Sequence, residues 1–394
     1  MIRFSAEERR WRLAERHRLT ESLRIDDVAA IADGLVALHS SDPATVHMSV
    51  LVRMSKPSIG AVEHALYEQR SIVRHHAMRR TLWVMTPAVA RLAHGAATAK
   101  VARAERKRTV AALVGSTDIK DADTWLDDAF AEVIALLQAE GPLTTRAIGH
   151  ALPHLAIPVT FGVKTKHPAA INAHTKVLQG AGFAAGLVRA QPTGAWTSAE
   201  YLWVPTEDWL GQPITGRTEA EAAPKLLDLW LRRFGPATET DIAWWFGWTA
   251  GLTRKTLTAI DATVADVDEG PAYVASGDAA PPDDPGPWVR LLPGLDATTM
   301  GWKKRDWYVD PAMVPRFFDR NGNAGPTVWA DGQIVGGWIQ RPDGKISIEL
   351  ARELSSTHQL LLDEAIDQLQ LVLGDAVVRP RFPAPVQKDL FDRA

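Results

Sequence analysis

The sequence predicts an α+β protein in which helix-turn-helix units, each followed by strands, are repeated and then joined to a small β domain. Three observations support this. Apolar residues at helical spacing alternate with short β-branched and aromatic runs. A Gly-Pro corner followed by a threonine occurs twice, as GPLT at 141–144 and GPAT at 235–238. From about residue 268 the chain becomes rich in Pro, Gly and Asp and in short strand-like runs.

The first unit is expected to span residues 1–115. Apolar residues at steps of three and four between Ile25 and Leu38 predict a helix that continues to about His39. Asp42-Pro43 predicts a turn or the start of a new helix, and Ser58 is a candidate N-cap for the next one. The stretch 71–87 predicts a hairpin with an Arg- and His-rich centre. Helices followed by a basic hairpin are the order of a winged helix.

Residues 116–212 and 213–275 repeat this plan. In the second unit a helix ends at Gly141, Thr144 caps a shorter helix, and strand-like sequence follows over 182–205. In the third unit, Thr238 or Thr240 caps a helix that is rich in tryptophan. A tight Gly-containing corner followed by a capped helix is typical of helix-turn-helix units. The tryptophans of that helix are interpreted as core residues rather than as a stacking surface.

The last region, residues 276–394, is expected to be a β domain with a closing helix. A linker or long loop is predicted from about residue 268 to 287. Asp-Gly pairs at 331–332 and 343–344 predict turns between short strands. The final amphipathic helix is expected to begin at Ser355 or Ser356.

Charge is distributed unevenly along the 394 residues, although the net charge is only −3. Residues 50–110 contain twelve Lys or Arg and three Glu, whereas 261–296 contains eight acidic residues and one Arg. This polarity indicates a surface that binds a polyanion, and the alternative is a solvated helix face with salt bridges. The absence of cysteine, of a secretory leader and of a long apolar run favours a cytoplasmic protein with no membrane contact.

Several common catalytic signatures are missing. The chain has neither of the glycine-rich phosphate loops, no His-Glu-x-x-His zinc motif and no Gly-x-Ser-x-Gly elbow. The rings of adjacent His75 and His76 would point to opposite faces of a strand, which is a poor metal site. We therefore expect no metal, no nucleotide and no other cofactor.

Five short motifs in order resemble those of a known family, the AlkZ-like winged-helix DNA glycosylases. They are LHSSDP (38–43), RHHAMRRTL (74–82), FGPAT (234–238), LLPGLDATTMGWKKR (291–305) and GPTVWADGQIVGGW (325–338). The resemblance implies three tandem winged helices and a β barrel, arranged as a C around duplex DNA. It also implies removal of bulky alkylated purines and unhooking of interstrand crosslinks.

The chain departs from the family pattern at the active segment. The family carries Gln-x-Gln or Gln-x-Asp where this chain has His39 and Ser41. Arg80 stands where a glycine is usual, and Trp83 where a histidine is frequent. Activity therefore depends on what the His-x-Ser segment can do.

Chemically, His39 is suited to hold or deprotonate water near C1′ of a damaged nucleotide, because neutral imidazole accepts a proton near neutral pH. Ser41 would position water, and Asp42 would orient the imidazole or stabilise an oxocarbenium-like sugar. The alternative is that this polar run only caps a helix. His47 is a further candidate, although a lone histidine is more often structural.

The expected partner is double-stranded DNA, bound by a monomer at the nucleoid. Arg74, Arg79 and Arg80 of the hairpin would contact phosphates or probe a groove. The remaining candidate DNA contacts are Arg53, Lys56 and Arg305. The resulting hypothesis is a monofunctional glycosylase that hydrolyses the N-glycosidic bond of N7- or N3-alkylated purines, including crosslinked ones. The alternatives are a non-catalytic winged-helix DNA-binding protein with a degenerate active site and, less well supported, a small-molecule-sensing transcription factor.

Overall fold

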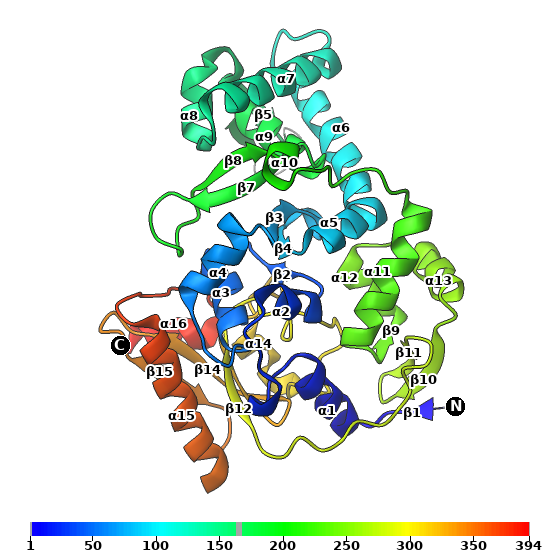
Figure 1. The fold of residues 1–394 in the computed structure, drawn as a ribbon, viewed down its shortest axis with the longest axis vertical. Helices are drawn as coiled ribbons and strands as arrows, with labels where there is room; N and C mark the ends of the chain where they lie inside the picture. The colour runs from blue at the N-terminus through cyan, green and yellow to red at the C-terminus, as the bar shows by residue number, and fades with distance from the viewer. Residues whose placement is uncertain (1, 163–167, 394) are drawn as a thin grey trace.

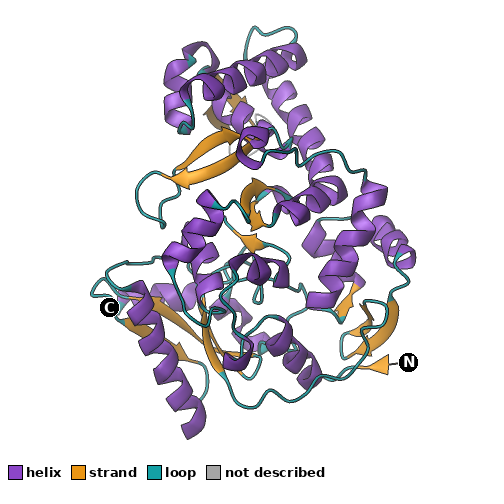
Figure 2. Cartoon of the chain, viewed as in Figure 1, coloured by secondary structure: helices purple, strands orange, loops and turns teal. Residues whose placement is uncertain are grey.

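A computed structural model describes residues 2–162 and 168–393 of the chain. Helices and strands alternate along its whole length, which confirms the α+β class (Figure 2). Helices α6–α9 form the upper part of the molecule, whereas the two chain termini lie in the lower part (Figure 1). No helix in the described ranges is long and apolar enough to cross a membrane.

The first elements place the Leu38–His39 part of the LHSSDP segment in a short strand, and its Asp42 and Pro43 at the start of a new helix. They are α1 (Ala6–Arg16), α2 (Val28–Gly34), β2 (Leu38–His39), α3 (Pro43–Leu51) and α4 (Ile59–Glu63). The prediction of a helix to His39 is wrong, because α2 ends at Gly34 and Val36 has a left-handed φ of 60°. The chain then pairs with a neighbouring strand. Asp42 caps α3, so Asp42-Pro43 starts a new helix, and Ser58 caps α4 as predicted.

A five-stranded sheet lies behind this segment, in the order β2-β4-β3-β7-β8. Its further strands are β3 (Val73–His76), β4 (Leu82–Met85), β7 (Leu187–Pro192) and β8 (Tyr201–Pro205). Antiparallel β3 and β4 confirm the predicted hairpin. Arg74 of β3 lies opposite Arg189 of β7, so strands from the first two predicted units share one sheet.

The upper part is mainly helical. It contains α5 (Pro87–Ala93), α6 (Ala99–Ser116), α7 (Ala122–Glu140), α8 (Thr145–Ala151), β5 (Pro158–Phe161), β6 (Ala169–Asn172), α9 (Ala173–Phe183) and α10 (Thr206–Leu210). Gly141 ends α7 at a φ of 84°, and the side chain of Thr144 caps α8, both as predicted.

The third group of elements surrounds an aromatic core. It comprises α11 (Glu219–Phe234), β9 (Ala237–Thr238), α12 (Glu239–Phe246), α13 (Ala250–Ala259), β10 (Thr263–Val267) and β11 (Gly270–Val274). Thr238, rather than Thr240, caps α12. Trp230, Phe234 and Trp245 pack ring against ring in the interior. The predicted loop from 268 is partly wrong, because 270–274 pairs with β10, which also pairs with β1 (Ile2–Arg3).

The C-terminal region has a second four-stranded sheet and two covering helices. Its elements are β12 (Val289–Leu292), α14 (Val314–Phe317), β13 (Thr327–Ala330), β14 (Gln333–Gln340), β15 (Ile346–Leu350), α15 (Ser356–Leu373) and α16 (Pro385–Asp392). Asp331 and Gly332 have the left-handed φ values of the predicted Asp-Gly turn. Ser355 caps α15, as predicted.

The acidic stretch 261–296 is largely neutralised within the molecule. Arginines of the N-terminal residues reach across to it: Arg3 pairs with Asp266 and Asp268, Arg9 with Glu269, and both Arg12 and Arg16 with Asp278. Part of the charge polarity in the sequence therefore reflects contacts between the N-terminal residues and the stretch 266–278.

Candidate active site

His39 lies at the edge of the five-stranded sheet and is almost fully buried, with 5% of its surface exposed. Its backbone pairs with Trp83 of β4, and the two rings contact each other with centroids 3.9 Å apart. The neighbouring Ser40 continues the strand, because its amide donates to the carbonyl of Leu82. Local β pairing thus fixes the position of the imidazole.

The Nε2 atom of His39 lies 3.2 Å from Nη2 of Arg79. A guanidinium can only donate, so Nε2 is the acceptor and the imidazole is neutral. Burial and, secondarily, the charge of Arg79 hold the pKa of His39 well below its usual value, while Asp296 acts weakly in the opposite direction. The ring therefore presents a lone pair, and Arg79 covers it.

Arg79 and Arg305 form a cationic pair around Trp244. The guanidinium of Arg79 lies 4.5 Å from the Trp244 ring and that of Arg305 lies 5.9 Å from it. Burial and the charge of Arg305 lower the pKa of Arg79 to about 10. The buried Nε of Arg79 has no hydrogen-bond partner among the described residues. Two cations at one ring, one of them with an unused buried donor, favour the binding of an anion here.

The hairpin connection is backbone-strained. Arg79 and Arg80 have left-handed φ values of 54° and 61°, which non-glycine residues seldom adopt. The side chain of Arg80 is exposed and pairs with Glu105. A positive φ at residue 80 explains why the family pattern favours glycine there.

Ser40 and Arg74 face the opposite side of the strand from His39. Nε of Arg74 donates to Oγ of Ser40 at 2.8 Å, and Nη1 donates to the hydroxyl of Tyr67 at 2.9 Å. Arg74 also lies over the ring of Tyr201, and only 1% of its surface is exposed. This burial does not fit the expected phosphate contact, and Arg74 instead holds the segment in place.

Ser41 and Asp42 are placed differently from each other. Ser41 is half-buried, and its carbonyl accepts from Nη1 of Arg381 at 3.2 Å. The carboxylate of Asp42 accepts from the amides of Ala44 at 3.1 Å and Arg381 at 2.7 Å. Burial raises the pKa of Asp42, and these amide bonds act against that shift. For Asp42, the helix-capping alternative therefore describes its observed contacts.

Arg53 is unsuited to its expected role at a DNA backbone. Its guanidinium is buried, forms a two-pronged ion pair with Asp296 at 2.8 and 2.9 Å, and also donates to three other groups. In this structure Arg53 instead links the residues that follow α3 to Asp296 and Thr298 of the C-terminal region. Lys56, by contrast, is exposed.

The nearby His47, His75 and His76 are buried among aromatic and histidine rings. His47 is fully buried against Trp196, and burial lowers its pKa to about 3. His75 lies near His94, whereas His76 stacks on Trp203, so the adjacent rings do point apart. Within residues 2–162 and 168–393, no group of three His, Asp or Glu is placed to hold a metal ion.

Sequence reasoning missed Trp244 and Arg381 as members of this site. Trp244 was grouped with its core neighbours, although it is the half-buried member of a helix that has Trp245 on its inner face. Arg381 follows the segment it contacts by more than three hundred positions, and no local pattern connects the two. The rotation of about 100° between adjacent residues of a helix, which separates Trp244 from Trp245, was the one available signal.

Comparison with known proteins identifies the class. The family described as "DNA glycosylase AlkZ-like" matches residues 32–371, and the chain therefore belongs to the AlkZ-like DNA glycosylase family. Membership makes DNA the substrate class. Among solved structures, DNA glycosylase AlkZ of Streptomyces sahachiroi has the same fold, with a TM-score of 0.71 at 19% identity. That match covers 96% of this chain and 100% of the other. No curated protein gives a significant match.

Proposed function

We propose that this protein is a monofunctional DNA glycosylase that hydrolyses the N-glycosidic bond of N7- or N3-alkylated purines, including crosslinked ones. The observation that supports this most directly is the neutral His39 on the family's active segment, with its Nε2 lone pair beside the Arg79–Arg305 cation pair. An alkylated purine already carries positive charge, so its departure needs little acid catalysis. What it needs is a held water and a stabilised sugar.

In the proposed reaction, the bond from C1′ to the purine nitrogen breaks and both electrons go to the purine, which neutralises its charge. Water adds to C1′ and leaves a 1′-hydroxyl, and its proton, which becomes acidic as the new bond forms, passes to Nε2 of His39 and from there to solvent. Nε2 of His39 accepts the hydrogen bond of that water. Because the pKa of His39 is lowered, holding the water is favoured over full proton removal in the ground state.

DNA binding would expose this lone pair. When a phosphate draws Arg79 and Arg305 toward itself, Arg79 leaves Nε2, and one cause of the lowered pKa is removed. We propose that Ser41 orients the water and that Asp42, through its bonds to Ala44 and Arg381, fixes the segment. Lys56 and Arg80, both exposed, would add phosphate contacts.

We further propose that the three helical units, over 1–115, 116–212 and 213–275, act as tandem winged helices, and that 276–394 is a barrel-like domain. The units would surround duplex DNA at the nucleoid, with one copy of the chain per site. The two capped corners at Thr144 and Thr238 support this interpretation.

The test is base release from duplex DNA containing N7-methylguanine or a nitrogen-mustard crosslink. His39→Ala should slow release on the order of a hundredfold after subtraction of spontaneous loss. His150→Ala, which removes an exposed ring on α8, is the matched control and should retain the wild-type rate. An unchanged rate in His39→Ala would remove the assignment of this histidine.

Two contacts favour a second function, that of a non-catalytic DNA-binding protein. The lone pair of His39 is covered by Arg79, and Asp42 serves as a cap, which is also what a non-catalytic DNA-binding protein with a degenerate site would have. Such a protein would bind duplex DNA with steep salt dependence and release no base from either substrate, with wild type and His39→Ala alike.

A further inference from the structure

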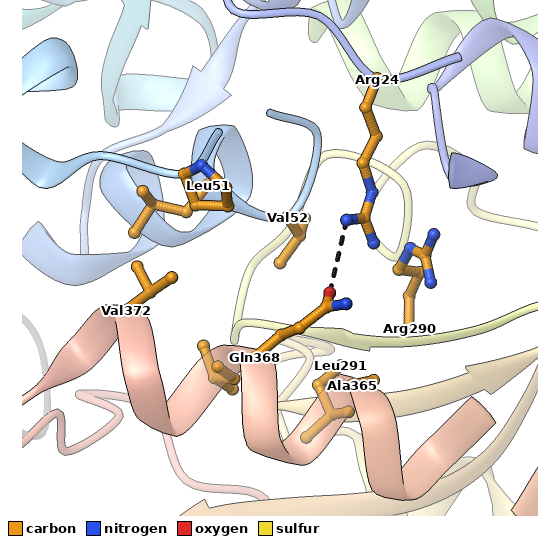
Figure 3. Close-up of a pocket in the computed structure, with 10 residues that line it drawn as sticks. Arg24, Leu51, Val52, Arg290, Leu291, Ala365, Gln368 and Val372 are labelled. Carbon is orange, nitrogen blue, oxygen red and sulfur yellow. Dashed lines mark hydrogen bonds between the residues drawn. The ribbon is translucent and has the colours of Figure 1, made fainter. Parts of the chain in front are cut away.

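A cleft that is lined by none of the candidate active-site residues lies between α15, β12 and the segments around residues 24 and 52 (Figure 3). Its apolar part encloses only about 40 Å³, and a more polar extension toward Pro285 and Trp288, which shares four of its lining residues, encloses about 280 Å³. Most of the inner wall is apolar and is made by Leu51, Val52, Pro57, Leu291, Ala365, Leu369 and Val372. The extension provides room for a small molecule, and the apolar wall beside it is the kind of lining that such pockets have.

Two arginines enter this apolar cleft from the same side. Arg24 is half-buried and Arg290 is 91% buried, with 9% of its surface exposed. Figure 3 shows their guanidinium groups next to each other above Gln368, whose Oε1 is 3.4 Å from Nη1 of Arg24. The direct contact of Arg290 is a bond from Nη1 to the carbonyl of Val289 at 2.6 Å.

The arginine pair lacks the carboxylate counter-charge that three other buried arginines have in the described parts of the chain. Arg9, Arg12 and Arg53 each form an ion pair with a carboxylate. At Arg24 and Arg290 the buried Nε atoms have no hydrogen-bond partner among the described residues.

The charges around the pair do not replace such a partner. Burial and the charge of Arg24 lower the pKa of Arg290 to about 9. Glu21 lies at the outer opening of the cleft, as does Glu364. Its charge raises the pKa of both arginines against the effect of burial, but it forms no ion pair with either in the described parts of the chain. Buried cations that lack a partner are costly unless an anion arrives.

We propose that this cleft is a second ligand site and that it binds a small organic anion, a carboxylate, phosphate or sulfonate attached to an apolar body. The anionic group lies between Arg24 and Arg290 and takes up their free donors. The apolar body lies against Leu51, Leu369 and Val372. None of these residues belongs to the candidate active site, so the proposal stands independently of the glycosylase reaction.

The probe is 1-anilinonaphthalene-8-sulfonate, whose fluorescence rises on binding, titrated into the full chain. Arg290→Met should weaken binding roughly tenfold to a hundredfold, the range of one or two charge-assisted hydrogen bonds. Gln368→Glu places an internal carboxylate beside Arg24 and should weaken binding to a similar degree. Gln359→Glu, at the exposed start of the same helix, is the matched control and should leave the affinity unchanged.

Two competitors separate the contributions to binding. Sulfate alone should displace the probe only weakly, and the uncharged N-phenyl-1-naphthylamine should bind at least tenfold less tightly than the sulfonate. The proposal is overturned if Arg290→Met and Gln368→Glu both bind the sulfonate like the wild type, or if the uncharged analogue binds equally well. Displacement of the probe by unmodified duplex DNA would also overturn it, because the cleft would then be part of the DNA interface.

Discussion

Lowering the pH from 8 to 5.5 is expected to reduce the free energy of unfolding by about 4 kcal/mol or more. His17, His47 and His75 are buried, and burial is the main reason that the pKa of each is lowered to about 3. In the unfolded chain the pKa of each histidine returns to about 6.5, so each takes up a proton as the pH falls below that value. Folded pKa values below the unfolded ones mean that this stability is fully present above pH 6.5. It is lost progressively as the pH falls toward 3.

At pH 5.5 each such histidine has lost about 1.4 kcal/mol, which gives about 4 kcal/mol for the three. His39 and His76, whose pKa values burial also lowers, add a change of the same sign. Carboxylates contribute little in this window because their unfolded pKa values lie near 4. The loss is a large share of the roughly 5–15 kcal/mol that stabilises a typical protein.

The assay is urea unfolding followed by tryptophan fluorescence at several pH values between 8 and 5.5. His75→Leu removes two buried ring nitrogens that lack partners among the described residues, and it should reduce the pH-dependent loss by about 1.4 kcal/mol. His150→Gln, at an exposed position, should leave the loss unchanged. Equal stability at pH 8 and 5.5, or a full loss in His75→Leu, would refute the reasoning.

Three further predictions concern the Arg53–Asp296 ion pair and the arginines of the hairpin. Asp296→Asn should destabilise the fold by about 3–5 kcal/mol in urea unfolding because it leaves the buried Arg53 without its counter-charge. The double variant Arg53→Met with Asp296→Leu should destabilise the fold less than that single change. A larger loss of stability in the double variant would contradict this. Arg80→Gly should be about 1 kcal/mol more stable than Arg80→Ala, since both lose the side chain and only glycine tolerates the φ of 61°. Arg79→Met should weaken duplex binding and reduce the slope of log affinity against log salt by about one, while Arg352→Met, a control at an exposed position, should not.

Local signals predicted most of the elements correctly. Caps at Thr144, Thr238 and Ser355, the hairpin of β3 and β4, and the Asp-Gly turn at 331–332 were all readable because each depends on a few adjacent residues. The prediction of a helix through His39 was wrong because it too used only adjacent residues. Its apolar spacing is helical, but pairing with Trp83 and Val84, more than forty positions later, decides the local conformation.

The site was predictable only in part. The prediction that His39 lies on a functional segment came from motif order, but its contact with Arg79 depends on a hairpin that folds back onto it. Charge alone could not separate the exposed Lys56 from the buried Arg53, because the acid that pairs with Arg53 lies in the C-terminal region. Long-range pairing is the information that a local pattern lacks.

The sheet that joins β3 to β7 has a consequence for how the chain is made. At synthesis rates of about 5–20 residues per second, β3 leaves the ribosome on the order of ten seconds before its neighbour β7 exists. During that interval the outer edge of β3 is an open template for another strand. A nascent chain interrupted before residue 187 would present this edge permanently, and two such fragments could exchange strands. The protein thus has a period of vulnerability set by translation, which slow codons between β3 and β7 would lengthen.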